Sequence, residues 1–347
     1  HISQEAIKSS ATSLLPAGSV LMVVRSGILA RIVPIAIAGC DLTINQDLKA
    51  LCPTGDILTP FLYYLLDSRM DELLSMVSRG ATVHRLMTEQ IRSMEFVLPP
   101  LPEQHRIVDI LDETLEGIAT AKANAEQNLQ NARALFESHL QSVFSQRGEG
   151  WVDAKLGDVC DRITDGTHVT PRYTPSGVPF LSVKNLTHGF IDFSNTRYIS
   201  VEEHRFLTRR CKPVRDDILY TKVGTTGIAQ VVDVDDEFSI FVSVALLKPK
   251  HEVVFNHYLE HFLNAPFARE QAEKRTRGMA NRNLVITDIK EIDIHYPAAL
   301  DKQRAIVADL DALSAETQRL ASIYERKLAA LEALKKSLLD QAFSGKL

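Results

Sequence analysis

Basic side chains gather in two stretches of this sequence, and both stretches could contact a phosphate backbone. The whole chain of 347 residues has a net charge of −5, which argues against a protein that simply coats nucleic acid. A polyanion, however, meets the local patch and not the total charge. The two basic stretches comprise Arg205, Arg209, Arg210, Lys212 and Arg215, and then Arg269, Lys274, Arg275, Arg277 and Arg282.

Residue patterns that mark catalytic and cofactor sites are absent from the sequence. It contains no G-x-G-x-x-G or G-x-x-x-x-G-K-[ST] phosphate loop, no G-x-S-x-G and no H-E-x-x-H. Residues 223–227 contain two glycines but do not lead into a periodic helix, so we predict a turn there. The four cysteines form no C-x-x-C pair, which predicts reduced thiols and neither a disulfide frame nor a zinc site. We therefore predict no catalysis by this chain alone, no cofactor and no metal.

A long helical stretch occurs twice. The run that starts at Glu103 recurs from Lys302, with glutamine, isoleucine–valine, leucine and aspartate at matched positions. Both copies continue with apolar residues three and four apart over several heptads, a pattern typical of a coiled coil. No compact domain needs two helices of roughly 60 Å, so we expect the two to pair in antiparallel fashion. The alternative is two independent surface helices on separate domains.

The repeat extends upstream of the helices into two globular segments. Leu62 and Leu66 match Leu259 and Leu263, and Leu86 matches Leu284. We predict an α+β fold with internal duplication: two globular mixed α/β domains separated by two long helices that form an antiparallel coiled coil. The expected domains are 1–98 and 148–297 for the globular copies, and 99–147 and 298–347 for the helices.

Local patterns predict the elements of each globular copy. Apolar residues at helical spacing predict helices over 61–76 and 255–274, and residues 285–296 are predicted as a strand. The second copy begins near Trp151, whereas the first begins at the equivalent of Tyr198, so we expect the first copy to lack its N-terminal part. No apolar run approaches eighteen residues and no signal peptide is visible. We therefore expect a cytoplasmic protein without a membrane span.

Five sequence motifs in the second copy carry a family resemblance. They are L-G-D-V at 156–159, I-T-D-G-T-H at 163–168, G-V-P-F-L-S-V-K-N-L at 177–186, D-I-L-Y-T-K-V-G-T-T-G at 217–227 and N-R-N-L at 281–284. Together they resemble a target recognition domain of the specificity (S) subunits of type I restriction–modification systems. The run P-P-L-P-E-Q at 99–104 is similar to the junction into the long helices of that family. The resemblance covers essentially the whole chain.

The resemblance implies a division of labour between subunits. The S subunit reads double-stranded DNA at a bipartite site, and its helix pair sets the gap between the half-sites. Separate methyltransferase (M) subunits bind S-adenosylmethionine and methylate adenine. Restriction (R) subunits supply ATP- and Mg-dependent translocation and nuclease activity. Two alternatives stay open: a coiled-coil scaffold that does not touch DNA, and a cryptic methyltransferase, which is disfavoured because no N-P-P-[YF] run occurs.

The resemblance also implies that polar loop residues contact DNA, because arginine and asparagine read guanine and adenine edges or hold phosphates. For each residue the alternative is a solvated surface charge or a turn. The candidates in the second copy are Thr164, Asp165, His168, Arg172, Lys184, Asn185, Lys222, Thr225, Thr226, Arg275, Arg277, Asn281, Arg282 and Asn283. The candidates in the first copy are Arg25, Ser26, Arg79, Thr82, His84 and Arg85.

Overall fold

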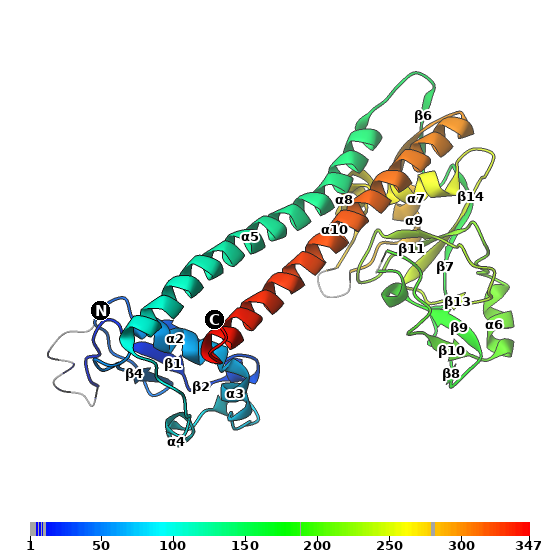
Figure 1. Cartoon of the computed structure of the whole chain (residues 1–347). Coiled ribbons are helices and arrows are strands. Elements are labelled where there is room, and N and C mark those ends of the chain that lie inside the picture. The colour runs from blue at the N-terminus through cyan, green and yellow to red at the C-terminus, as the bar shows by residue number, and fades with distance from the viewer. Residues whose placement is uncertain (1–4, 6, 8, 10–11, 188, 279–281) are drawn as a thin grey trace. The chain divides into compact units, whose positions relative to one another are not determined.

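The structure is a computed structural model that describes residues 5, 7, 9, 12–187, 189–278 and 282–347 (Figure 1). It divides into two compact units. Unit 1 comprises His1–Asn128 with Ile323–Leu347, and unit 2 comprises Leu129–Ser322. Each unit contains a globular part and a segment of both long helices (Figure 1). This architecture confirms the predicted α+β class.

The two long helices are α5 (Leu101–Ser145) and α10 (Leu300–Phe343). In unit 1 they run in opposite directions, because Arg106 of α5 donates to the carbonyl of Leu347 (3.0 Å) while Lys122, further along α5, pairs with Glu332. Within each unit, apolar side chains of α5 and α10 are buried in the same hydrophobic cluster. Those of unit 1 include Ile107, Leu111, Leu339 and Ala342, and those of unit 2 include Leu140, Phe144, Val307 and Leu310. The antiparallel helix pair is therefore confirmed.

The globular part of unit 1 is built on a three-stranded antiparallel sheet in the order β3-β1-β4. Its strands are β1 (Val20–Val23), β3 (Ile35–Ile37) and β4 (Leu48–Leu51). The remaining elements are β2 (Arg25–Ser26), η1 (Gly27–Ala30), α2 (Thr59–Ser68), α3 (Met70–Ser75), β5 (His84–Arg85) and α4 (Thr88–Arg92). Helix α2 buries Phe61, Leu62, Leu65 and Leu66 in the core, at the spacing of one helix face.

A fully buried glutamine joins α5 to this globular part. Gln104 accepts a hydrogen bond from the backbone N–H of Leu58, at 2.9 Å. Leu58 is the N-cap residue of α2 and offers no capping side chain of its own. The Gln104 amide donates to the carbonyls of Asp56 (2.9 Å) and Pro99 (2.8 Å). One side chain therefore caps α2 and holds the chain that leads into α5.

Unit 2 contains a four-stranded sheet in the order β12-β11-β14-β7 and a second in the order β13-β9-β10-β8. The strands of the first sheet are β7 (Cys160–Asp165), β11 (Ile218–Thr221), β12 (Ala229–Val231) and β14 (Val244–Pro249). Those of the second are β8 (Tyr173–Thr174), β9 (Val178–Leu181), β10 (Arg197–Ile199) and β13 (Ser239–Ile240). Strand β6 (Trp151–Lys155) pairs with β15 (Asp293–Pro297). The helical elements are η2 (Val183–Asn185), α6 (Val201–Thr208), α7 (Asn256–Asn264), α8 (Pro266–Arg275) and α9 (Ile286–Lys290).

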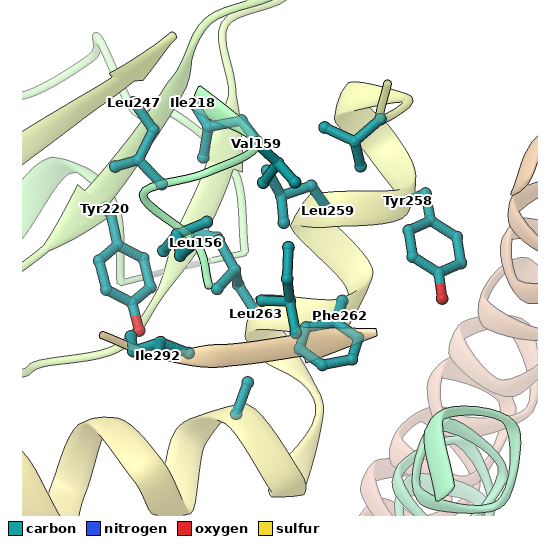
Figure 2. Packing of buried hydrophobic residues seen from close by; sticks show 14 of the residues in the cluster. Leu156, Val159, Ile218, Tyr220, Leu247, Tyr258, Leu259, Phe262, Leu263 and Ile292 are labelled. Atoms are coloured by element: carbon teal, nitrogen blue, oxygen red, sulfur yellow. The ribbon is translucent and has the colours of Figure 1, made fainter. Parts of the chain in front are cut away.

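The main core of unit 2 lies between the first sheet and α7. Figure 2 shows the side chains of Leu156 and Val159 beside Leu259 and Leu263 of α7, with Ile292 in the same cluster. This packing covers both the sheet face and the apolar face of the helix, which is how a mixed fold buries each of them.

The glutamine contact of unit 1 is repeated in unit 2. Gln303 is fully buried and accepts from the N–H of Phe255, the N-cap residue of α7, at 2.7 Å. Its amide donates to the carbonyls of Val253 (3.0 Å) and Pro297 (2.8 Å). The duplication predicted from sequence therefore extends to the contacts that anchor each long helix.

Three of the predicted elements were wrong in type or length. The helix predicted over 61–76 is divided into α2 and α3 at Arg69. Residues 285–296 were predicted as a strand, but they form α9 followed by β15. Ile286 and Ile289 lie three apart, and this helical spacing governs the first half. The helix predicted over 255–274 is divided into α7 and α8 at Ala265, because Pro266 occupies the first position of a new helix.

Candidate nucleic-acid interface

The structure brings the glycine-containing loop and the 282–283 segment together in unit 2. Val223 and Asn283 form an antiparallel bridge. The N–H of Gly224 donates to the carbonyl of Arg282 (2.9 Å), and Leu284 donates to the carbonyl of Lys222 (2.8 Å). Candidate residues that are about sixty positions apart in the sequence thus belong to one backbone network.

The predicted turn at 223–227 is confirmed, and its glycines have a structural reason. Gly224 and Gly227 adopt φ values of +79° and +87°, which glycine tolerates without strain. At Gly227 a Cβ atom would also lie 3.2 Å from the Cβ of Ala272. Thr225 is exposed at the tip of the turn, whereas Thr226 is buried and bonds the hydroxyl of Thr276 at 3.1 Å.

Unit 1 contains the same arrangement at the matching positions of the repeat. β2 pairs with β5, with Arg25 opposite Arg85 and Ser26 opposite His84. Arg25, Arg85 and the candidates Arg79 and Thr82 are exposed, whereas Ser26 and His84 are half-buried. Arg25 lies 3.7 Å from Asp47. The candidate residues of the first copy therefore also converge on one strand pair and its adjoining loop.

Asp165 and Lys222 are buried against each other and are not presented to solvent. The Lys222 ammonium lies 3.4 Å from the Asp165 carboxylate, and the lysine side chain is only 5% exposed. The same carboxylate pairs with Arg210 and lies 3.2 Å from the ring of His168, an exposed residue. This cluster ties the end of β7 to the end of β11, so it positions the 223–227 turn. Its geometry is that of a buried, multiply compensated ion pair.

A cavity of about 880 Å³ opens beside the turn. Gly224 and Thr225 line one part of it, and Lys184 and Asn185 of η2 line another. Lys184 is exposed, whereas Asn185 is buried and its amide donates to the carbonyl of Asp192 at 2.9 Å. Asn185 thus shapes the cavity wall, while Lys184 and Thr225 offer it polar atoms.

Sequence reasoning missed the aromatic wall of this cavity. Tyr173, Phe180 and Phe241 follow one another with ring centroids 6.0 and 6.1 Å apart. The Arg197 guanidinium lies 4.5 Å from the centroid of the Tyr173 ring, a cation–π geometry. The sequence signal was weak, because Arg197 and Tyr173 come from β10 and β8 and only the tertiary structure makes them neighbours.

The remaining candidates differ in their exposure and in the partners that their side chains contact. Arg277 is exposed and pairs with Asp288 at 2.9 Å, and Arg282 pairs with Glu273. Arg275 is half-buried and donates to the carbonyls of Gln271 and Glu291. Thr164 is half-buried in β7, Arg172 is exposed in a loop, and Asn281 lies outside the described residues.

Three candidate residues contain buried polar atoms that have no hydrogen-bond partner in the described part of the chain. They are Nε of Arg282 and Oδ1 of Asn283 in unit 2, and Nδ1 of His84 in unit 1. Arg282 and His84 occupy matching positions of the repeat. A buried polar atom without a partner costs free energy, on the order of 1–3 kcal/mol. These atoms are therefore suited to bond a ligand.

The four cysteines are unpaired, as expected. Burial raises the pKa of the Cys160 thiol to about 12 and that of Cys211 to about 11, so both stay protonated and unreactive at neutral pH. In the described ranges no group of three or more histidine, cysteine or acidic residues could hold a metal ion. None of the described helices is long and apolar enough to cross a membrane.

A family model for the type I restriction modification DNA specificity domain matches residues 1–130 and 148–325. The chain belongs to this family. The two matched ranges correspond to the two copies of the internal repeat. Membership agrees with the prediction of a recognition subunit that is not itself an enzyme.

The chain is also similar to specificity subunits of type I restriction enzymes. The chain is 37% identical over 148 residues to the EcoR124I/EcoR124II type I restriction enzyme specificity subunit of Escherichia coli, covering 42% of this chain and 36% of the relative. It is 23% identical over 312 residues to the EcoBI specificity subunit of Escherichia coli, covering 83% and 65%. The chain therefore spans less than two thirds of the length of either relative.

Two solved structures share the fold of this chain. A chain from a study of complex assembly and conformational transition of the type I R-M system superposes with a TM-score of 0.80 at 20% identity, covering 96% of this chain and 84% of that one. The HsdS subunit from Thermoanaerobacter tengcongensis gives a TM-score of 0.60 at 20% identity, with coverage of 96% and 82%. Both likenesses support the duplicated architecture.

Proposed function

We propose that this chain is the DNA-reading subunit of a type I restriction–modification complex. Each unit reads one half of a bipartite site in double-stranded DNA, and the α5–α10 pair holds the two halves at a set spacing. The chain supplies recognition and no catalysis. It works in the cytoplasm, where its DNA substrate lies.

The observation that carries this proposal is the convergence of candidate residues around the cavity of unit 2. Lys184 and Arg197 supply positive charge, Thr225 supplies a hydroxyl, and the 223–227 turn lets the backbone approach closely. Arg282 and Asn283 add partnerless polar atoms nearby. These are the groups that hold phosphates and hydrogen-bond base edges.

The buried members of the candidate set act differently. Asp165, Lys222 and Thr226 hold the turn in place, and Asn185 holds η2. They position contact residues and do not touch DNA themselves. The contacting set in unit 2 therefore comprises the exposed Lys184, Thr225, Arg172 and Arg277 with Arg197, Arg282 and Asn283.

The long helices are proposed to dock the catalytic subunits. Asp109, Asp112, Glu113 and Glu116 are exposed on α5 and give it an acidic surface. The M subunits would bind S-adenosylmethionine and methylate adenine, and the R subunits would use ATP and Mg. This chain is proposed to bind none of these cofactors.

The first experiment is to co-purify the chain with its methyltransferase subunits and to map adenine methylation across a genome. Methylation at a two-part motif with a fixed gap is the expected result. Methylation at a single half-site would limit reading to one unit. Absence of both complex and methylation would favour the scaffold alternative, and tight S-adenosylmethionine binding by the isolated chain would favour the cryptic methyltransferase.

A binding experiment then tests the site itself. Replacement of Lys184 or Arg197 by alanine should weaken binding to a duplex that contains the mapped motif and lower the slope of log K against log salt by roughly one. Lys327→Ala, at an exposed lysine of α10, is the matched control and should leave the slope unchanged. Equal slopes for all the proteins would refute a phosphate contact at the cavity.

A further inference from the structure

Asn195 lines the cavity of about 880 Å³ in unit 2, two residues before Arg197. It stands just ahead of β10, in a segment where no local sequence pattern marks a binding residue. Its side chain is exposed, and no other described residue forms a hydrogen bond with its amide. The carboxamide of Asn195 is therefore available to a ligand that enters the cavity.

Other polar side chains around the cavity already have partners. Asn185 is buried, and its amide donates to the carbonyls of Asp192 (2.9 Å) and Asn195 (3.3 Å). The hydroxyl of Ser182 donates to Oδ1 of Asn185, at 3.3 Å. Ser243 is buried and accepts from the N–H of Val183 at 3.1 Å. These side chains build the cavity wall, whereas the amide of Asn195 faces a ligand.

The backbone holds Asn195 in place on both sides. The carboxylate of Asp192 accepts from the N–H (2.8 Å) and the hydroxyl (2.6 Å) of Ser194, which fixes the turn before Asn195. The hydroxyl of Thr196 donates to the carbonyl of Phe180 in β9 at 3.1 Å. Because the carbonyl of Asn195 is itself bonded to Asn185, its position is set before any ligand arrives. Such preorganisation reduces the entropy that binding costs.

Two cations without an acidic partner accompany Asn195 around the cavity. Lys184 and Arg197 are exposed, and neither pairs with a carboxylate of another described residue. Arg277 and Arg282, by contrast, pair with Asp288 and Glu273. The guanidinium of Arg197 is instead held over the Tyr173 ring. Lys184 and Arg197 can therefore hold phosphates, and phosphate contacts fix the register in which base edges are presented to a protein.

An asparagine side chain has the chemistry to select one base. Its amide contains a donor and an acceptor side by side, which match N7 and the N6 amino group of adenine in the major groove. A hydroxyl such as that of Thr225 both donates and accepts at one atom, so it discriminates less between bases. Of these two exposed side chains of the cavity, only that of Asn195 can make the paired contact.

We propose that Asn195 is a specificity-determining residue of unit 2 and selects adenine at one base pair of the half-site. Its Nδ2 donates to N7 of the adenine and its Oδ1 accepts from the N6 amino group. Lys184 and Arg197 hold phosphates of the same half-site. The inference rests on the proposed function, since it names the base that this DNA-reading site selects.

The test measures binding of the full chain to duplexes in which each base pair of the mapped motif is replaced in turn. The parent should lose at least about tenfold in affinity when the A·T pair read by Asn195 is replaced. Asn195→Ala should bind the original and the replaced duplex within about threefold of each other at that one pair, and should discriminate as the parent does at every other pair. Its dependence on salt should match that of the parent, because no charge is removed.

A second variant should change the preference and not merely remove it. Asn195→Asp places a carboxylate, which only accepts hydrogen bonds, at the same position. It should favour cytosine at the pair where the parent favours adenine, because it accepts from the cytosine amino group and repels N7 of adenine. Asn124→Ala, at an exposed asparagine of α5, is the matched control and should keep the parent's preference at every pair.

Three results would overturn the proposal. The first is undiminished discrimination at every A·T pair in Asn195→Ala, and the second is discrimination lost at a G·C pair. The third is an equal loss of affinity on all duplexes, which would make Asn195 a backbone contact or, with a lowered unfolding midpoint, a structural residue. A parent chain that prefers no duplex would refute the proposed function, and this inference with it.

Discussion

Among single residues, Asp165 is expected to have a large effect on stability. It compensates the ammonium of Lys222, which is almost fully buried, and also pairs with Arg210. Asp165→Asn should lower the free energy of unfolding of unit 2 by roughly 3–5 kcal/mol, because it leaves a buried lysine charge without its partner. Denaturant unfolding followed by a probe in unit 2 measures this.

The control for that variant is an ion pair of similar geometry on the surface. Arg215 and Asp235 approach to 2.7 Å but both are largely exposed, so Asp235→Asn should leave the unfolding midpoint nearly unchanged. If Asp165→Asn also left the unfolding midpoint nearly unchanged, the cluster of Asp165, Lys222 and Arg210 would have no positioning role. The candidate residues Asp165 and Lys222 would then have to be considered again as direct DNA contacts.

His295 makes unit 2 sensitive to acid. Its Nε2 donates to the carbonyl of Phe144, and the centroid of its ring lies 5.0 Å from the centroid of the Phe262 ring. Burial is the main effect on the pKa of His295 and lowers it below its ordinary value of 6.5. The unfolded chain therefore takes up this proton before the folded chain does. Stability should fall as the pH drops through about 6.5, and His295→Gln should weaken that dependence.

His257 provides a comparison of opposite sign. Its hydrogen bond to Glu260 raises the pKa of His257, so its contribution is present below the unfolded pKa and is lost as the pH rises through the folded pKa. His257→Asn should therefore destabilise unit 2 more at pH 5 than at pH 8. Unfolding midpoints of both variants at these two pH values measure the contrast, and parallel pH profiles would contradict it.

Among the elements, the junction between each globular part and its long helix depends on one glutamine. Gln303→Met keeps the side-chain volume but leaves the N–H of Phe255 and the carbonyls of Val253 and Pro297 without this partner. Each buried N–H or carbonyl that loses its hydrogen-bond partner lowers the free energy of unfolding by an amount on the order of 1–3 kcal/mol. We expect unit 2 to lose stability, as measured by hydrogen exchange along α7.

The duplication supplies a matched experiment in the other unit. Gln104→Met should destabilise unit 1 in the same way, whereas Gln318→Met, at an exposed position of α10, should have little effect. An equal response of all three variants would show that the glutamine contacts do not anchor the helices.

For the whole molecule, the proposed spacer role predicts a change in the DNA site. The seam passes through Ala125 and Ala132 in α5, and through Leu310 and Thr317 in α10, each pair seven residues apart. Duplicating residues 125–131 and 317–323 together keeps both seams in register and lengthens each helix by roughly 10 Å. The gap of the methylated motif should grow by about three base pairs.

Lengthening one helix alone is the control. It shifts one seam against the other, so we expect loss of stability and of methylation and no new spacing. If the double insertion left the gap unchanged, the helix pair would not be the spacer.

The sequence by itself determined the duplication, the long helices and the absence of known catalytic motifs. Heptad spacing is a local property, and repeated residues such as Gln104 and Gln303 are visible without coordinates. The sequence also identified Thr225, Arg282 and Asn283 as candidate contact residues, because a glycine turn and an arginine–asparagine run can be recognised from neighbouring residues alone.

Only the tertiary structure decided which candidates are available to a ligand. Asp165 and Lys222 have the same polar side chains as true surface residues, and their burial comes from strands far apart in the sequence. The aromatic wall of Tyr173, Phe180 and Phe241 likewise forms by strand pairing. Burial and strand order are long-range properties, and local sequence patterns do not encode them one residue at a time.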